Sequence, residues 1–406
     1  MNTSERNPVF EQLFTESVMD RMGKLSYGDW RQLSAPGAVS LSYGYPFPES
    51  FPNEKLVSAA EELFDAEGDV ALQYGGGEYA DELAPIVADR IRDRGIDCDD
   101  DEVLITNGAS SGIDTVCRTV LEPGDAVFTE APTFMGTLAL FRNFGVDIVP
   151  FDIDENGLDV DQLEVALRQR EADGEDPPKI VYTIPNFQNP TGTTLTLERR
   201  ERLVELAEEF GFLVIEDDAY GRLRYDGDDV PPLAAIDNSG RVAHVGTFSK
   251  TIAPGVRTGW VIADAAFLEQ ARPMFAGGAN TLMEGVLARY CEAGYLEETV
   301  PKLREEYARR RDHMLDCLER EMPPAVDWTE PEGGFFVWVE IPDVDTNELL
   351  HDAGEEGVTY LPGQMFFPGD ETANTLRLSF SHVSLEEMER GVAALGRTAV
   401  TALEET

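Results

Sequence analysis

His244-Val-Gly-Thr-Phe-Ser-Lys-Thr-Ile-Ala-Pro-Gly-Val-Arg-Thr-Gly-Trp-Val-Ile-Ala263 is a stretch with two apolar runs on either side of a polar loop. The runs, Val242–Phe248 and Trp260–Ala263, have the length and apolar content of buried strands. Lys250 lies in the loop between them. Burying an ammonium group is costly, so a lysine in this setting needs a partner or loses its proton. A neutral lysine amine is a nucleophile that reacts with carbonyl compounds.

Two further observations favour a chemical role for Lys250 over the alternative, a loop lysine in solvent. Arg257 follows seven residues later and could bind a phosphate through its guanidinium group. A ligand with an aldehyde for the lysine amine and a phosphate for the arginine is pyridoxal 5′-phosphate (PLP). The chain also avoids lysine, although it has 32 basic residues. Its lysines stand only at Lys24, Lys55, Lys179, Lys250 and Lys302.

Two other predicted strands end in polar side chains. Ile180–Gly192 is a strand that ends in the turn Asn-Pro-Thr-Gly, which directs the amide of Asn189 inward. The run from Phe212 is a buried strand that ends in Glu-Asp-Asp-Ala-Tyr, with Asp217 and Tyr220 in an Asp-x-x-Tyr pattern. Side chains alternate along a strand, so the neighbouring carboxylates should face away from Asp217. No cluster of His or Cys accompanies these acids, and we predict no metal site.

A strand, a glycine turn and a helix follow one another in Val103–Gly112 and on to Leu121. The N-terminus of a helix presents free amides and a positive dipole end to an anion. Ala109 and Ser110 stand at that position, so this turn is a candidate phosphate site. Near the C-terminus, Thr375–Phe380 alternates apolar residues with Arg377 and Ser379, which predicts a strand. Arg377 could bind a carboxylate or simply be exposed.

These motifs together resemble the PLP-dependent fold type I aminotransferases of class I/II, and within them the 2-aminoadipate aminotransferase-like branch. The resemblance is carried by Thr247-Phe-Ser-Lys250 followed by Pro254-Gly-Val-Arg257, and runs from about Leu41 to Leu395. It implies that Lys250 holds PLP covalently and that Asp217 pairs with the pyridine nitrogen and keeps it protonated. The remaining cofactor contacts that it implies are the phosphate ligands Ala109, Ser110 and Arg257, the ring-stacking Phe134, the phenolic-oxygen partners Asn189 and Tyr220, and Thr247 and Ser249 of the lysine motif.

The resemblance also implies residues for substrate and for a second subunit. Arg377 matches the arginine that grips the substrate α-carboxylate, with Asn189 and Gly44 close to the substrate. Tyr74 matches a tyrosine that reaches the phosphate of the neighbouring subunit's cofactor, which implies a homodimer with shared active sites. The substrate side chain is left open, because the first forty residues match this branch poorly.

The predicted fold class is α/β. Strands alternate with helices from about residue 70 to 265, as expected for a mostly parallel sheet. The resemblance implies a seven-stranded sheet in a large PLP-binding domain, 46–280, and a smaller α+β C-terminal domain, 281–406, joined by an N-terminal segment, 1–45. A helix-turn-helix DNA-binding domain, which related regulators carry, would need more room than this segment has.

The composition of the chain limits the classes of partner that it can bind. The net charge of −46 disfavours nucleic acid and anionic membranes, which carry the same sign. No apolar run reaches the roughly 18 residues of a membrane span, and the N-terminus has no signal-peptide core. The four cysteines form no paired motif and are expected as reduced thiols, as in the cytoplasm. Self-repulsion at this charge predicts a protein adapted to concentrated salt.

The sequence therefore predicts amino-group transfer between an α-amino acid and a 2-oxo acid. Two alternatives remain at this point. The same scaffold could carry another PLP reaction, such as β-elimination or racemisation, because a fold does not determine a reaction. A PLP-binding regulator without a DNA-binding domain is the non-enzymatic alternative, which binding of nucleic acid in high salt would reveal.

Overall fold

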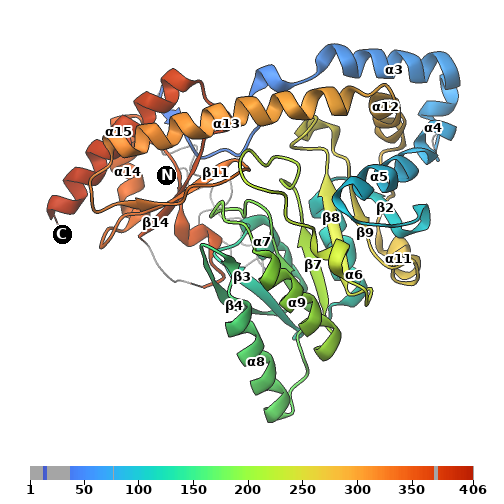
Figure 1. Cartoon of the computed structure of the whole chain (residues 1–406), viewed down its shortest axis with the longest axis horizontal. Helices are drawn as coiled ribbons and strands as arrows, with labels where there is room; N and C mark the ends of the chain where they lie inside the picture. Colours follow the sequence, from blue (N-terminus) through green and yellow to red (C-terminus); the bar gives the residue numbers. More distant parts are fainter. Residues whose placement is uncertain (1–11, 16–36, 76, 370–373, 406) are drawn as a thin grey trace.

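A computed structural model describes residues 12–15, 37–75, 77–369 and 374–405 of the chain. Within these residues the largest sheet has eight strands (Figure 1). In spatial order they are β2 (Val103–Thr106), β9 (Gly259–Ile262), β8 (Val242–Thr247), β7 (Leu213–Asp217), β6 (Ile180–Thr183), β3 (Ala126–Ala131), β4 (Asp147–Asp154) and β5 (Gly157–Leu158).

The sheet is mostly parallel, as predicted, but it has one strand more than the seven that the resemblance implies. The five strands β8, β7, β6, β3 and β4 are parallel to one another, whereas β9 runs antiparallel between β2 and β8. The additional strand is β5, which turns back through Glu155 and Asn156 and pairs antiparallel with β4. With two residues, it is too short to show a periodic pattern in the sequence.

Helices cover both faces of this sheet, because its strands are apolar on both sides. The helices α6 (Ala109–Val120), α7 (Met135–Phe144) and α11 (Ala265–Ala271) pack with one set of strand residues, including Ile215 and Val245. The helices α8 (Val160–Asp173) and α9 (Leu197–Phe210) pack with the opposite set, including Val181 and Val214. Because successive side chains point to opposite faces and are apolar on both, the sheet is covered on both sides, which produces three layers.

A second, smaller unit contains a four-stranded antiparallel sheet within the described residues. Its order is β10 (Asp327–Trp328), β11 (Phe336–Glu340), β14 (Thr375–Ser379) and β13 (Leu361–Pro362). The N-terminal strand β1 (Val39–Ser40) pairs with β12 (Val358–Thr359), and the helices α14 (Thr346–Glu356) and α15 (Leu385–Glu405) complete this unit.

The helix α13 (Tyr295–Glu321) connects the two units and runs along one side of the molecule (Figure 1). Before it, α12 (Thr281–Glu292) packs on α3 (Asn53–Glu67), α4 (Glu78–Asp81) and α5 (Leu83–Ile91) of the large unit. The pairing of β1 with β12 joins Val39 and Ser40 to the small unit. Residues 1–11 and 16–36 of that segment lie outside the described residues.

Candidate active site

A cavity of about 220 Å³ lies where the carboxyl ends of β2, β6, β7 and β8 meet the small unit. Ligand sites of open α/β sheets lie at this edge. Most of the residues predicted for the site line this cavity. They are Gly44, Ala109, Ser110, Phe134, Asn189, Asp217, Tyr220, Thr247, Ser249, Lys250, Arg257 and Arg377.

Lys250 lies three residues after the end of β8 and lines the cavity. Its Nζ donates a hydrogen bond to the carbonyl oxygen of Gly44 at 3.0 Å and lies 5.7 Å from the centre of the Tyr220 ring. Burial, together with the positive charges of Arg377 and Arg257, lowers the pKa of Lys250 to about 8, against the opposing effect of Asp217. The side chain is therefore not the solvent-exposed loop lysine of the alternative interpretation, and its amine has a substantial neutral fraction near neutral pH.

Asp217, the last residue of β7, presents one carboxylate oxygen to the cavity. Its Oδ2 accepts a hydrogen bond from the hydroxyl of Tyr182 at 2.7 Å. Its Oδ1 is buried and has no hydrogen-bond partner in the described part of the chain. Burial raises the pKa of Asp217 to about 6. A buried acceptor without a donor is costly, so the site fits a ligand that brings an N–H group, as the protonated pyridine ring of PLP does.

The neighbours of Asp217 face away from it, as strand alternation predicts. Glu216 accepts hydrogen bonds from the backbone amides of Leu233 and Ala234 at 2.7 and 3.1 Å. Asp218 pairs with Arg94 and accepts a hydrogen bond from the Asn186 side chain at 2.7 Å. Each of these carboxylates thus has partners outside the cavity, which leaves Asp217 as the acid that faces the cofactor position.

The start of α6 and the side chain of Arg257 form a cradle for an anion. Gly108 is the N-cap of α6, and no side chain of the described residues caps the first turn. Arg257 donates a hydrogen bond to the carbonyl oxygen of Asn107 at 3.1 Å, which holds its guanidinium group beside this turn. Gly108 has a φ of 88°, and a Cβ atom there would lie 2.7 Å from Arg257 Nη2. Free amides, the helix dipole and a cation at one point fit a phosphate group.

Arg377 enters the cavity from β14 of the small unit. It is 3% exposed, donates hydrogen bonds to Asn189 Oδ1 at 2.8 Å and to the carbonyl oxygen of Ser42 at 2.6 Å, and stacks 3.9 Å from the Phe336 ring. It is therefore not an exposed strand arginine. Because Asn189 belongs to the large unit, the two units meet at a guanidinium group that can bind a carboxylate through two parallel hydrogen bonds.

Tyr74 is the one predicted site residue that does not line the cavity. It is fully exposed on the chain. The structure also shows residues that sequence reasoning did not assign, namely Tyr182 beside Asp217 and the cavity-lining Tyr45 and Phe336. Aromatic residues near Gly44 and Gly334 were visible in the sequence, but their contact with the site depends on how the small unit packs.

The described residues contain no group of three or more His, Cys, Asp or Glu side chains that could hold a metal ion. None of the helices in the described ranges is long and apolar enough to cross a membrane. The four cysteines, Cys98, Cys117, Cys291 and Cys317, are buried free thiols.

Residues 41–395 match the family model described as aminotransferase class I and II. An aromatic-amino-acid aminotransferase 1 from Thermococcus litoralis is 38% identical over 394 residues, which cover 96% of this chain and 94% of that protein. A 2-aminoadipate transaminase from Thermus thermophilus is 35% identical, with 89% of this chain and 90% of that protein covered.

A solved structure shows the same architecture. The kynurenine aminotransferase of Pyrococcus horikoshii, in complex with the pyridoxamine form PMP, superposes with a TM-score of 0.90 at 35% identity, covering 98% of this chain and 99% of that one. The chain therefore belongs to the aminotransferase class I and II family and is a PLP-dependent aminotransferase.

Proposed function

We propose that Lys250, Asp217 and Arg377 carry out the transfer of an amino group between an α-amino acid and a 2-oxo acid. The observation that carries this assignment is that an amine with a lowered pKa, a buried carboxylate oxygen without a partner and a bidentate cation line one cavity. Phe134, Tyr220, Thr247 and Ser249 line the same cavity and complete the proposed cofactor site.

Each of these side chains has a distinct task. PLP, when bound, withdraws electrons from the Cα of the amino acid through its protonated ring. Asp217 faces that ring nitrogen, while Arg257, Ser110 and the N-terminus of α6 bind the phosphate. Arg377 orients the substrate through its α-carboxylate, with Asn189 holding the guanidinium group in place. The amine of Lys250, neutral in part near pH 8, takes up the Cα proton and returns it.

The two directions of the half-reaction test this proposal. Addition of an amino acid alone should convert the bound PLP to its pyridoxamine form, and addition of a 2-oxo acid should restore it, as followed by absorbance. β-Elimination would release ammonia, and racemisation would invert the amino acid, while both leave the cofactor as PLP. Either of these results in place of the two-way conversion would contradict the assignment.

For the substrate, we propose a donor with an apolar or aromatic side chain. The basic residues among the described lining of the cavity are Lys250, Arg257 and Arg377, and each already has a task. The aromatic side chains of Tyr45 and Phe336 line the cavity beside Arg377. Steady-state rates with a panel of donors should rank aromatic and large apolar amino acids above 2-aminoadipate and glutamate. A preference for the acidic donors would contradict this proposal.

We also propose a homodimer in which each active site borrows Tyr74 from the other subunit. Tyr74 is fully exposed on the chain, and so in large part are the apolar side chains of Val57, Phe64, Val70 and Leu72 before it, which a second subunit would cover. If Tyr74→Phe and Lys250→Ala are both inactive as separate proteins, mixing them should restore part of the activity in hybrid dimers. No recovery, once subunit exchange is confirmed, would count against a shared site.

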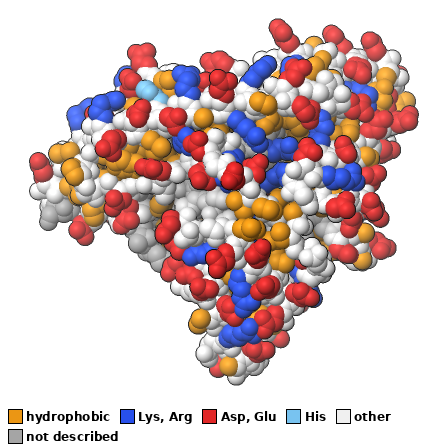
Figure 2. Space-filling view, in the orientation of Figure 1, with side chains coloured by type: hydrophobic (Ala, Val, Ile, Leu, Met, Phe, Trp, Pro, Cys, Tyr) orange, Lys and Arg blue, Asp and Glu red, His pale blue; other side chains and the backbone are white. Residues whose placement is uncertain are grey.

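The remaining proposals concern the environment of the protein. Acidic side chains are scattered over the face shown in Figure 2, with basic side chains between them. Together with the net charge of −46, this supports a protein adapted to concentrated salt. Four buried free cysteines support a reducing compartment, for which we propose the cytoplasm.

A further inference from the structure

The two oxygens of the Asp217 carboxylate have different surroundings. Tyr182 donates its hydroxyl hydrogen to Oδ2 at 2.7 Å, whereas Oδ1 is buried without a partner among the described residues. A carboxylate held at one oxygen by a fixed donor has little freedom to rotate. Its other oxygen, Oδ1, is therefore fixed in one direction. Because Asp217 lines the cavity, this oxygen is presented to a ligand bound there.

Sheet register explains why Tyr182 reaches Asp217. Tyr182 of β6 pairs with Ile215 of β7. Side chains two residues apart on a strand lie on the same face, so Ile215 and Asp217 share the face of the sheet on which Tyr182 lies. The tyrosine thus crosses from the neighbouring strand to the carboxylate at the strand end.

Two side chains of helix α7 contact Tyr182 and fix its position. The Oγ1 of Thr137 donates to the hydroxyl oxygen of Tyr182 at 3.1 Å. The Phe141 ring packs against the Tyr182 ring edge to face, with centres 5.7 Å apart at 82°. Tyr182 is fully buried. Since its oxygen accepts from Thr137, its own hydrogen is free to be donated to Asp217, which accepts only.

We propose that Tyr182 is a positioning residue that fixes the Asp217 carboxylate and lowers its affinity for protons, so that the proton stays on the ring nitrogen of the cofactor. The inference rests on the proposed pairing of Asp217 with that nitrogen. Burial raises the pKa of Asp217, and the hydrogen bond from Tyr182 opposes this rise. Without the tyrosine hydroxyl, the carboxylate would compete with the ring nitrogen for their shared proton.

The test is the ¹⁵N chemical shift of the ring nitrogen at neutral pH in the holoenzyme, loaded with PLP that carries ¹⁵N at that position. This shift reports protonation of the ring directly and does not depend on turnover. In Tyr182→Phe, it should move toward the value of the unprotonated ring, because the shared proton passes in part to Asp217. A hydrogen bond to a charged group is worth roughly ten- to a hundredfold in such an equilibrium constant. Thr137→Val, which removes the donor behind Tyr182, should move the shift in the same direction by less.

Tyr360→Phe is the matched control. Tyr360 is also fully buried and donates its hydroxyl to the carbonyl oxygen of Thr346 at 2.7 Å, in the small unit. Its loss should lower thermal stability and leave the ¹⁵N shift at neutral pH unchanged. An unchanged ¹⁵N shift in both Tyr182→Phe and Thr137→Val, or an equal change in Tyr360→Phe, would overturn the role of Tyr182.

Asp217→Asn separates this inference from the proposed site. If Asp217 faces the ring nitrogen, the asparagine variant should change the ¹⁵N shift at neutral pH more than any tyrosine variant. A change in Asp217→Asn without one in Tyr182→Phe and Thr137→Val would refute the role of Tyr182 alone. No change in Asp217→Asn would refute the assignment of Asp217 and, with it, the inference.

Discussion

Burial of the Lys250 amine favours its proposed function but lowers the stability of the folded chain. In the PLP-free chain its pKa falls to about 8 from an ordinary value near 10.5. Between these pH values the unfolded chain binds more protons, so the free energy of unfolding rises with pH. Lys250→Met should therefore be more stable than the parent at pH 7, by about 1–3 kcal/mol, and this difference should fade as the pH rises from 8 to 10.5.

Denaturant unfolding of the PLP-free proteins across this pH range measures the effect. Lys55→Met is the control, because Lys55 lies near the surface and pairs with Glu298. Its stability relative to the parent should not follow the same profile. A difference between Lys250→Met and the parent that does not change with pH would show that the buried ammonium is not the cause.

The proposed binding of a carboxylate by Arg377 depends on the shape of the guanidinium group as well as on its charge. Arg377→Lys keeps a cation but loses the planar fork that binds a carboxylate through two hydrogen bonds. We expect kcat/KM for amino acids to fall about ten- to a hundredfold, corresponding to roughly 1.5–3 kcal/mol, while PLP stays bound. Steady-state kinetics with a cofactor absorbance spectrum check this. Loss of PLP, or unchanged kinetics, would place Arg377 outside the substrate site.

At the scale of elements, the approach of α6 to Arg257 depends on a glycine. A side chain at Gly108 would be strained at a φ of 88° and would meet Arg257 Nη2 at 2.7 Å. Gly108→Ala should therefore displace the guanidinium group and weaken PLP binding about ten- to a hundredfold, the value of a charged hydrogen bond. Fluorescence titration of the PLP-free protein with PLP measures the dissociation constant.

Gly124→Ala is the matched control for this substitution. Gly124 has a φ of 90°, and a Cβ atom there would meet nothing within 4 Å. The two variants share the backbone strain and differ in the contact with Arg257. Equal PLP affinities in the two variants would mean that the close approach at α6 does not matter for the phosphate.

Site residues that a single element marks could be predicted from the sequence, whereas contacts between elements could not. Lys250 and Asp217 stand out because each is a polar residue at the end of an apolar strand, which is a local pattern. The partner of Asp217, Tyr182, could not be predicted, since it lies 35 residues earlier and reaches Asp217 only through the pairing of β6 with β7. Likewise β5 has two residues and no periodicity, and its presence depends on the turn after β4.

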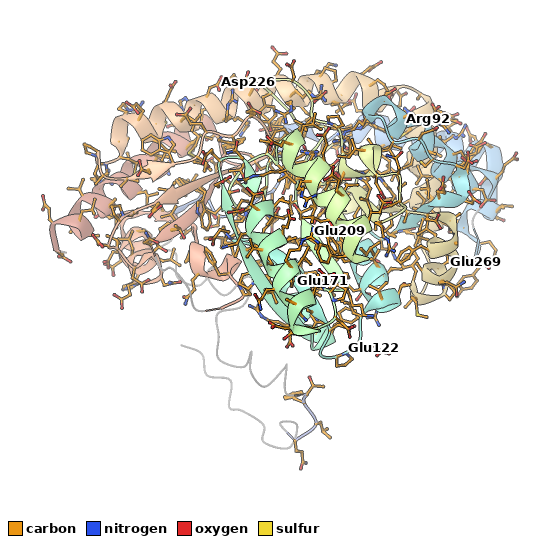
Figure 3. All side chains as sticks on the ribbon, turned by 60° about the horizontal axis from the view of Figure 1, so that its bottom comes forward. Arg92, Glu122, Glu171, Glu209, Asp226 and Glu269 are labelled. Carbon is orange, nitrogen blue, oxygen red and sulfur yellow. The ribbon has the colours of Figure 1, made fainter. Side chains whose placement is uncertain are left out.

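At the scale of the whole molecule, repulsion among the many carboxylates is the main electrostatic effect. Exposed carboxylates such as Glu122, Glu171 and Glu209 lie on different segments of the chain, as Figure 3 shows, and the net charge is −46. Screening by salt shortens the range of their repulsion to about 3 Å at 1 M, from about 10 Å at 0.1 M. We expect helical circular dichroism and activity to be lost on dilution from molar salt. Unchanged structure and activity in dilute buffer would contradict adaptation to salt.

The covalent attachment of PLP to Lys250 is the central claim, because the roles proposed for the cavity, for the cradle at α6 and for Asp217 all require a cofactor joined there. Reduction of the holoenzyme with borohydride makes this attachment permanent, and mass spectrometry of its peptides locates it. The account predicts a pyridoxyl group on Lys250, and none in Lys250→Ala. A pyridoxyl group on Lys24, Lys55, Lys179 or Lys302, with Lys250 unmodified, would contradict it.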